Sequence, residues 1–205
     1  MTTQHAPDAP HGRRGLLALA ALFLLPVALA FWLHYGVPGW RPPGSANRGD
    51  LIDPPVVLPS LEFANMDGGP AERDVLHGRW TLLYVGDGRC DARCRDALYL
   101  TRQTRLALNR DAARVRRVFL ATGRCCDDQT LRTAHPDLVV AMPSQAQLEL
   151  LARLIPVPDR GSLADAGRIY VVDPLGNLML SYSEHAPDKA LLEDLKRLLR
   201  LSHIG

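Results

Sequence analysis

The sequence predicts an α/β domain built on a central mixed sheet, and three observations support this prediction. Two apolar runs, 82–85 and 118–121, flank a single helical pattern, as in a strand–helix–strand crossover with parallel strands. Two further apolar runs, 169–172 and 178–182, flank the turn-forming residues 173–177 and predict an antiparallel hairpin. The last segment repeats leucine at helical spacing, which indicates a helix with one buried face.

The remaining elements follow from the same periodicities and from turn signals. Asp67, Gly68 and Gly69 form a turn signal after the first expected strand, and Ser144 is the expected N-cap of a helix. The predicted strands cover 58–63, 80–85, 117–122, 138–142, 169–172 and 178–182, and the predicted helices cover 97–108, 130–134, 144–154 and 188–202.

The four cysteines lie in two pairs, and each pair follows a predicted buried strand. Cys90 and Cys94 come directly after the first strand, where a helix begins. A helix N-terminus favours the thiolate, which is both a nucleophile and a soft-metal ligand, so this pair predicts a redox or soft-metal site. A purely structural disulfide is the other interpretation. A cysteine pair at this position also predicts a thioredoxin-like fold.

Cys125 and Cys126 follow the second predicted strand. Because neighbouring parallel strands end at the same edge of a sheet, we expect all four thiols to lie at one edge, with Cys125 and Cys126 as accessory thiols. This arrangement permits exchange between the pairs, or a Cu(I) site made of thiolates alone. The alternative is that the second pair is incidental to a variable loop.

The N-terminal third of the chain predicts a membrane anchor and a linker. Residues 1–14 form a polar tail, and residues 15–35 form an apolar helix whose uncharged stretch, at about 1.5 Å per residue, is roughly 29 Å long. Residues 36–57 are rich in proline and glycine and are expected to be a linker to a domain at 58–205. The sequence Ala28-Leu29-Ala30 leaves a cleaved signal peptide as the alternative to an anchor.

Charge and composition limit the partners and the compartment. The 205-residue chain has a net charge of +2, and its arginines alternate with acidic residues, so no nucleic-acid partner is expected. Arg13 and Arg14 precede the apolar helix, which predicts a cytoplasmic N-terminus and a domain across the membrane. In a bacterium this is the inner membrane with the domain in the oxidising periplasm, where paired cysteines can cycle.

The segment from about residue 58 to 201 resembles the Sco/SenC family of cytochrome c oxidase assembly proteins, which are thioredoxin-like. Three family motifs carry the resemblance: an Asp-Gly turn and strand start, a Cys-x3-Cys pair and an Ile-Tyr-Leu-Val-Asp-Pro-x-Gly hairpin. They correspond here to Asp67-Gly68 with Gly78-Arg79-Trp80, to Cys90 and Cys94, and to the hairpin from Ile169 to Gly176. The resemblance implies copper binding by the two cysteines and a role in oxidase assembly.

Two departures from the family pattern change what the resemblance implies. The family carries a histidine before the hairpin as the third copper ligand, whereas this chain has Asp165 there, and carboxylate is a poor ligand for Cu(I). The third ligand is therefore unknown. The second departure is Cys125-Cys126, where the family has a polar loop. His135 and His185 lie in predicted loops and are expected to be exposed rather than metal ligands.

Three functions follow from these observations. The first is a membrane-anchored thiol–disulfide redox protein or copper chaperone that acts on a cytochrome c oxidase subunit or another thiol protein, with redox chemistry favoured. The second is a non-catalytic thioredoxin-like scaffold for oxidase assembly. The third, a peroxidase-like reductant, ranks last because its Pro-x3-Thr/Ser-x2-Cys motif is absent from the sequence.

Overall fold

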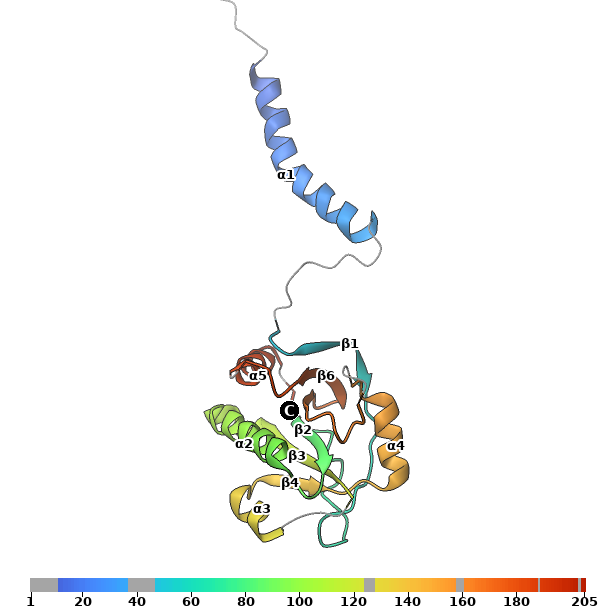
Figure 1. Cartoon of the computed structure of the whole chain (residues 1–205). Helices are drawn as coiled ribbons and strands as arrows, with labels where there is room; N and C mark the ends of the chain where they lie inside the picture. Colours follow the sequence, from blue (N-terminus) through green and yellow to red (C-terminus); the bar gives the residue numbers. More distant parts are fainter. Residues whose placement is uncertain (1–10, 37–46, 124–127, 158–160, 188, 203) are drawn as a thin grey trace, which may run out of the picture. The chain divides into compact units, whose positions relative to one another are not determined.

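The computed structural model describes residues 11–36, 47–123, 128–157, 161–187, 189–202 and 204–205 (Figure 1). The chain divides into two compact units, Met1–Ser45 and Ala46–Gly205. The described part of the first unit is helix α1 (His11–Gly36). The second unit contains the sheet, the remaining helices and the cysteine pair Cys90–Cys94.

Helix α1 is long and apolar enough to cross a membrane. Residues Arg14–Leu33 form this candidate span, with Pro26 inside the helix. Leucine and phenylalanine side chains are exposed all around it, including Leu22, Phe23 and Phe31. Such a surface is unfavourable in water and suited to lipid. The predicted apolar helix is therefore confirmed, while anchoring and orientation stay predictions.

The second unit is built on a six-stranded mixed sheet in the order β1-β6-β5-β2-β3-β4. Strands β2, β3 and β4 are parallel to one another, and β1, β6, β5 and β2 pair antiparallel. The strand bounds are β1 (Asp50–Val57), β2 (Trp80–Asp87), β3 (Val115–Thr122), β4 (Leu138–Ala141), β5 (Ile169–Val172) and β6 (Asn177–Tyr182). The predicted crossover and hairpin are both present.

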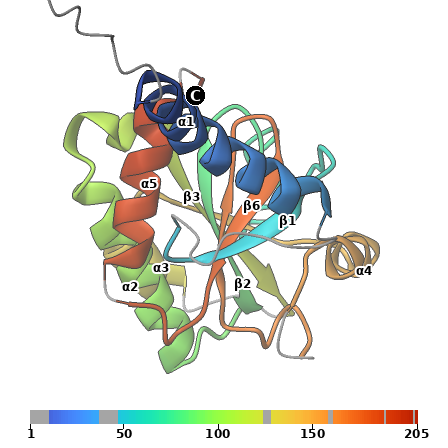
Figure 2. The same cartoon turned by 90° about the horizontal axis from the view of Figure 1, so that it is seen from above.

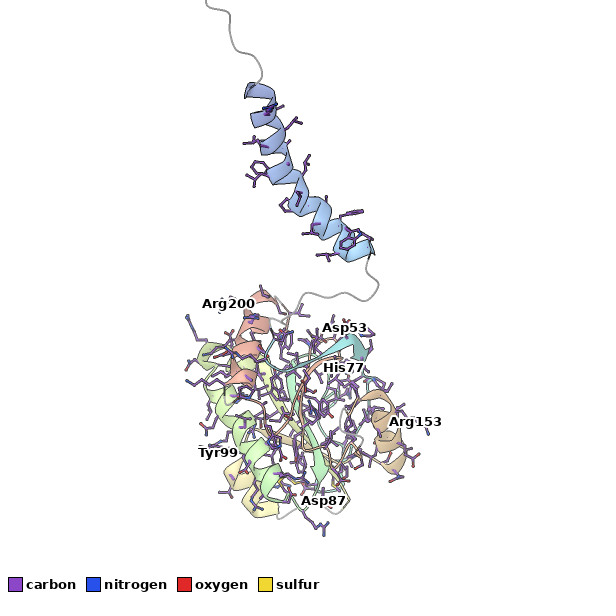
Figure 3. The ribbon with its side chains drawn as sticks, turned by 45° about the horizontal axis from the view of Figure 1, so that its top comes forward. Asp53, His77, Asp87, Tyr99, Arg153 and Arg200 are labelled. Atoms are coloured by element: carbon purple, nitrogen blue, oxygen red, sulfur yellow. A yellow bond between two sulfur atoms is a disulfide. The ribbon has the colours of Figure 1, made fainter. Side chains whose placement is uncertain are left out.

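Strand β2 lies in the middle of the domain because its residues are apolar on both faces. Leu82 and Tyr84 belong to one core cluster, whereas Leu83 and Val85 belong to the other, as the alternation of a strand requires. Helices α2 (Ala92–Leu106) and α5 (Ala190–Leu201) cover the first face, and α4 (Gln145–Leu154) covers the second (Figure 2). Helices α2 and α4 consequently lie on opposite sides of the domain, as the labels of Tyr99 and Arg153 show (Figure 3).

Two short helices lie in the connections between the parallel strands. A 3-10 helix, η1 (Asn109–Arg114), joins α2 to β3, and helix α3 (Asp128–Ala134) precedes β4. Helix α4 begins at a capping box, in which the Ser144 hydroxyl accepts from the Gln147 amide and the Gln147 side chain accepts from the Ser144 amide. The predicted N-cap is confirmed.

Two expectations for the start of the domain are wrong. Residues 50–57, expected to be linker, form the edge strand β1, and residues 58–63, expected to be a strand, belong to no strand. Strand β1 pairs with β6 through Asp50↔Ser181 and Val57↔Asn177. Asp194 of α5, only 2% exposed, accepts hydrogen bonds from the backbone amides of Arg48 and Gly49 and holds the chain just before β1. Prolines at 54 and 55 favoured a linker, but an edge strand tolerates them.

Candidate functional site

The loop between β2 and α2 is closed by backbone hydrogen bonds that place the first cysteine at the sheet edge. The Gly88 amide donates to the Thr122 carbonyl at the end of β3 (2.8 Å), and the Cys90 amide donates to the Asp87 carbonyl (3.0 Å). The Asp87 carboxylate accepts from the Arg89 amide (2.8 Å), which completes the tight turn. Cys90 itself has a φ of 48°, in the left-handed region that a residue with a Cβ seldom adopts.

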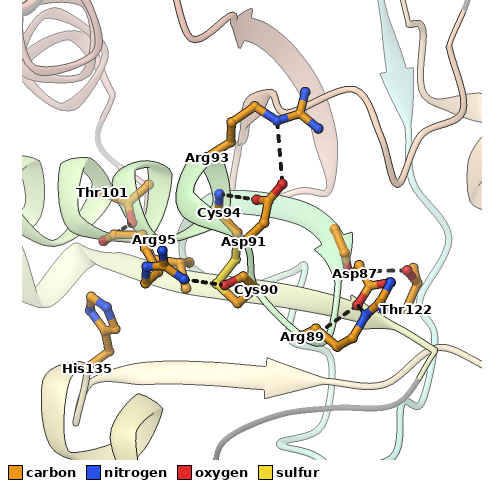
Figure 4. The surroundings of a disulfide bond; sticks show 12 residues. Asp87, Arg89, Cys90, Asp91, Arg93, Cys94, Arg95, Thr101, Thr122 and His135 are labelled. Atoms are coloured by element: carbon orange, nitrogen blue, oxygen red, sulfur yellow. Dashed lines mark hydrogen bonds and ion pairs between the residues drawn. A yellow bond between two sulfur atoms is a disulfide. The ribbon is translucent and has the colours of Figure 1, made fainter.

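Helix α2 starts at Asp91, one residue after this turn. The Asp91 carboxylate accepts from the Cys94 amide (3.0 Å) and caps the helix. Cys94 therefore lies in the first helical turn and Cys90 just before it, so both sulfurs are close to the positive end of the helix (Figure 4).

Cys90 and Cys94 are joined by a disulfide, with their Cα atoms 5.0 Å apart. The two sulfur-bearing residues differ in exposure: Cys94 is 2% exposed within the core cluster, whereas Cys90 is only partly buried. A reagent in solvent therefore reaches the disulfide from the Cys90 side.

The two cysteines line different hollows. Cys94 lines a small one of about 40 Å³ together with Tyr84 and Asp165. Burial, reinforced by the Asp91 carboxylate, raises the pKa of Tyr84 to about 12, so its hydroxyl stays protonated at neutral pH. Asp165, the residue at the expected histidine position, therefore lines the same hollow as Cys94 and does not line the groove of Cys90.

Cys90 lines a larger groove of about 510 Å³ between α2 and α3. Arg95 donates to the Cys90 carbonyl (3.1 Å), which brings a guanidinium beside the residue. Arg89 is neutralised by Asp87, with Nη2 and Oδ2 2.9 Å apart, and this pairing lowers the pKa of Asp87. The positive charge next to Cys90 thus comes chiefly from Arg95 and from the helix N-terminus.

A buried arginine of β3 connects the sheet to helix α2. Arg117 of β3 is fully buried and donates to the Leu98 carbonyl (2.6 Å), to the Thr101 hydroxyl (3.1 Å) and to Asp137 (2.9 Å). Burial lowers the pKa of Arg117, and Asp137 opposes that shift. Arg117 is not among the residues singled out from the sequence. Its position in a run predicted to be a buried strand is nevertheless a signal, because a buried charged side chain needs partners for its charge and hydrogen bonds.

His135 was expected to be exposed, and the structure corrects this expectation. It is partly buried at the end of α3, lies 3.3 Å from Arg117 through Nδ1, and lines the same groove as Cys90. Its proline neighbour favoured an exposed loop, but the long-range contact with Arg117 is not visible in local sequence. His185 is exposed, as predicted.

We expect the four thiols to lie close together, but Cys125 and Cys126 belong to residues 124–127, which are outside the described part of the chain. The strand ends behave as expected: Asp87 of β2 and Thr122 of β3 are register partners at one sheet edge. Among the side chains that the structure describes, no group of three or more His, Cys, Asp or Glu is arranged to hold a metal ion.

Together these features define a class of protein: a thioredoxin-like domain, with a mixed sheet flanked by helices and a disulfide where the first parallel strand meets a helix. The chain belongs to the family described as transmembrane-like, thioredoxin-like, C-terminal domain, whose model matches residues 80–202, more than half of the chain. No curated protein sequence matches the chain.

Solved structures confirm the fold. The copper-bound ScoI of Bradyrhizobium japonicum is 19% identical, with a TM-score of 0.53 over 69% of this chain and 98% of that chain. The apo Sco1 of Thermus thermophilus is 18% identical, with a TM-score of 0.59 over 77% and 99%. A thiol:disulfide interchange protein of Chlorobium tepidum is 15% identical, with a TM-score of 0.54 over 72% and 99%.

Proposed function

We propose that the chain is a membrane-anchored thiol–disulfide exchange protein whose reactive pair is Cys90 and Cys94. The observation that carries this proposal is the unequal exposure of the two residues in one disulfide at a helix N-terminus. An accessible sulfur can attack or be attacked, and a buried neighbour can resolve the mixed disulfide. Arg95 and the start of α2 place positive charge near Cys90, whereas Cys94 is buried in the core.

The exchange proceeds in two displacements. The Cys90 thiolate attacks one sulfur of a partner disulfide, a mixed disulfide forms, and the other partner sulfur leaves as a thiolate that takes a proton from water. Cys94 then loses its proton to solvent, and its thiolate attacks the Cys90 sulfur, so the partner leaves as a dithiol. Two electrons pass to the partner, and the Cys90–Cys94 disulfide is the product.

We place this exchange in cytochrome c oxidase assembly, with the domain in the bacterial periplasm. The sequence resemblance to Sco/SenC proteins, the fold shared with ScoI and Sco1, and the candidate span Arg14–Leu33 support this setting. The partner is an oxidase subunit or another thiol protein.

Copper delivery is the second candidate function, with Cu(I) as cargo on the reduced pair. Two thiolates are suitable soft ligands, but the residue beside Cys94 at the expected third position is the carboxylate of Asp165. The described residues around the disulfide therefore offer two thiolates and a carboxylate, a ligand set that fits Cu(I) poorly.

A trapping experiment tests the exchange. The reduced full-length chain in detergent is mixed with a small disulfide, and mixed disulfides are detected by mass spectrometry. We expect Cys94→Ser to accumulate an adduct on Cys90, and Cys90→Ser to react at least roughly tenfold more slowly, because burial shields Cys94. Equal trapping by both variants, or no exchange by the natural chain, contradicts the proposal.

Two further measurements separate the alternatives. A Cu(I) titration against a competing chelator eliminates copper delivery if the reduced chain binds no tighter than the Cys90→Ala/Cys94→Ala double variant. If that double variant still supports oxidase assembly in cells, the scaffold function replaces both proposals.

A further inference from the structure

The groove beside Cys90 continues away from the disulfide along α2 and α3. Its walls include Tyr99 and Arg102 of α2, together with Leu131 of α3 and His135. A second hollow of about 300 Å³ shares Leu131 and His135 and extends the surface to Met66. The two hollows share these two residues, and we name them together the α2–α3 groove.

The charge in the α2–α3 groove is positive. Arg95 and Arg102 line it and are ion-paired with no acidic side chain in the segments that the structure describes. Asp96 is the one acidic residue among those lining the part near Cys90. An acidic ligand is therefore favoured over a basic one.

The groove also offers apolar and hydrogen-bonding surface. Tyr99 is 60% exposed although it is a large aromatic residue, and such residues are frequent anchors in protein interfaces. His135 lies beside Arg117, and because a guanidinium can only donate, Nδ1 must accept and Nε2 carries the proton. Burial lowers the pKa of His135, which keeps the ring neutral and leaves Nε2–H as a donor.

We propose that the α2–α3 groove binds an extended acidic segment of the partner polypeptide, with the partner's sulfur at Cys90 and its carboxylates on Arg95 and Arg102. The ligand class is a peptide with a cysteine flanked by Asp or Glu and by one large apolar residue for Tyr99. This inference rests on the proposed exchange function and names its substrate class.

Binding is tested first, without any redox step. A fluorescent acidic peptide with serine in place of its cysteine is titrated with the oxidised full-length chain in detergent, and anisotropy is measured. We expect saturable binding that weakens with salt, and about a three- to tenfold loss of affinity in Arg102→Gln, the effect of one lost charge contact. Arg153→Gln on α4, the matched control, carries the same charge change on the opposite side (Figure 3) and leaves the affinity unchanged.

Exchange is tested second, with acidic and neutral peptides of equal length that carry the same thiopyridyl mixed disulfide. We expect the reduced natural chain, whose Cys90 thiolate attacks the peptide sulfur and releases thiopyridine, to react faster with the acidic peptide, and Arg102→Gln to reduce that preference. Equal rates with both peptides contradict the proposal that the groove binds an acidic segment. Equal affinities of the Arg102 and Arg153 variants, measured by anisotropy, contradict it as well. If the acidic peptide binds but neither peptide undergoes exchange, the proposed binding of an acidic segment is supported and the redox function is contradicted.

Discussion

Arg117 is the residue on which the position of the cysteine helix depends. It joins β3 to the Leu98 carbonyl and Thr101 hydroxyl of α2, and to Asp137 and His135 before β4. A buried guanidinium is costly unless its donors are satisfied, and here its partners come from α2 and from the segment before β4. One side chain therefore sets the distance between α2 and the strand beneath it.

We predict that Arg117→Ala lowers the free energy of unfolding by about 3 kcal/mol, because buried acceptors lose their donor and a cavity remains. Urea unfolding of the soluble domain measures this change. Arg153→Ala, which removes an exposed arginine of α4, is the control and is expected to change stability by less than about 0.5 kcal/mol. A loss below about 1 kcal/mol for Arg117→Ala disagrees with this account.

At the scale of elements, β1 differs most from the expectation for its residues, which was a linker. It completes the sheet beside β6, and its approach is fixed by the buried carboxylate of Asp194, which also accepts from the Tyr182 hydroxyl (2.9 Å). Ile52 and Val56 of β1 pack against the core cluster on the α4 side. The strand is thus part of the domain rather than a spacer.

We predict that a chain of residues 58–205 is less stable than one of residues 46–205 by at least about 3 kcal/mol. The shorter chain leaves one side of β6 unpaired and removes two backbone donors from the buried Asp194. Urea unfolding of both proteins compares them. Equal midpoints and slopes for the two proteins contradict a structural role for β1.

At the scale of the whole molecule, the prediction concerns the membrane. We expect the full chain to remain with membranes after washing at high pH, and residues 46–205 alone to be soluble, because the candidate span Arg14–Leu33 lies outside that unit. Protease added to spheroplasts tests orientation and is expected to degrade the domain. Protection of the domain in intact spheroplasts places it in the cytoplasm instead.

Much of the fold was predictable, since the buried strands and the Cys90–Cys94 junction depend on local periodicity and on turn residues. The failures share one cause, which is that their partners are distant in sequence. Strand β1 is defined by β6 and by Asp194, and the burial of His135 depends on Arg117. Patterns in a short stretch of sequence carry no information about such distant partners. A strand with two prolines at the sheet edge therefore looks like a linker in the sequence.

The position of β1 at the sheet edge has one further consequence. Pro54 and Pro55 lie within this strand and have no amide hydrogen to offer, so its outer side is a poor template for another strand. An open sheet edge would let neighbouring copies of the domain pair strand to strand. The two prolines therefore reduce the tendency of neighbouring copies of this domain to associate through β1.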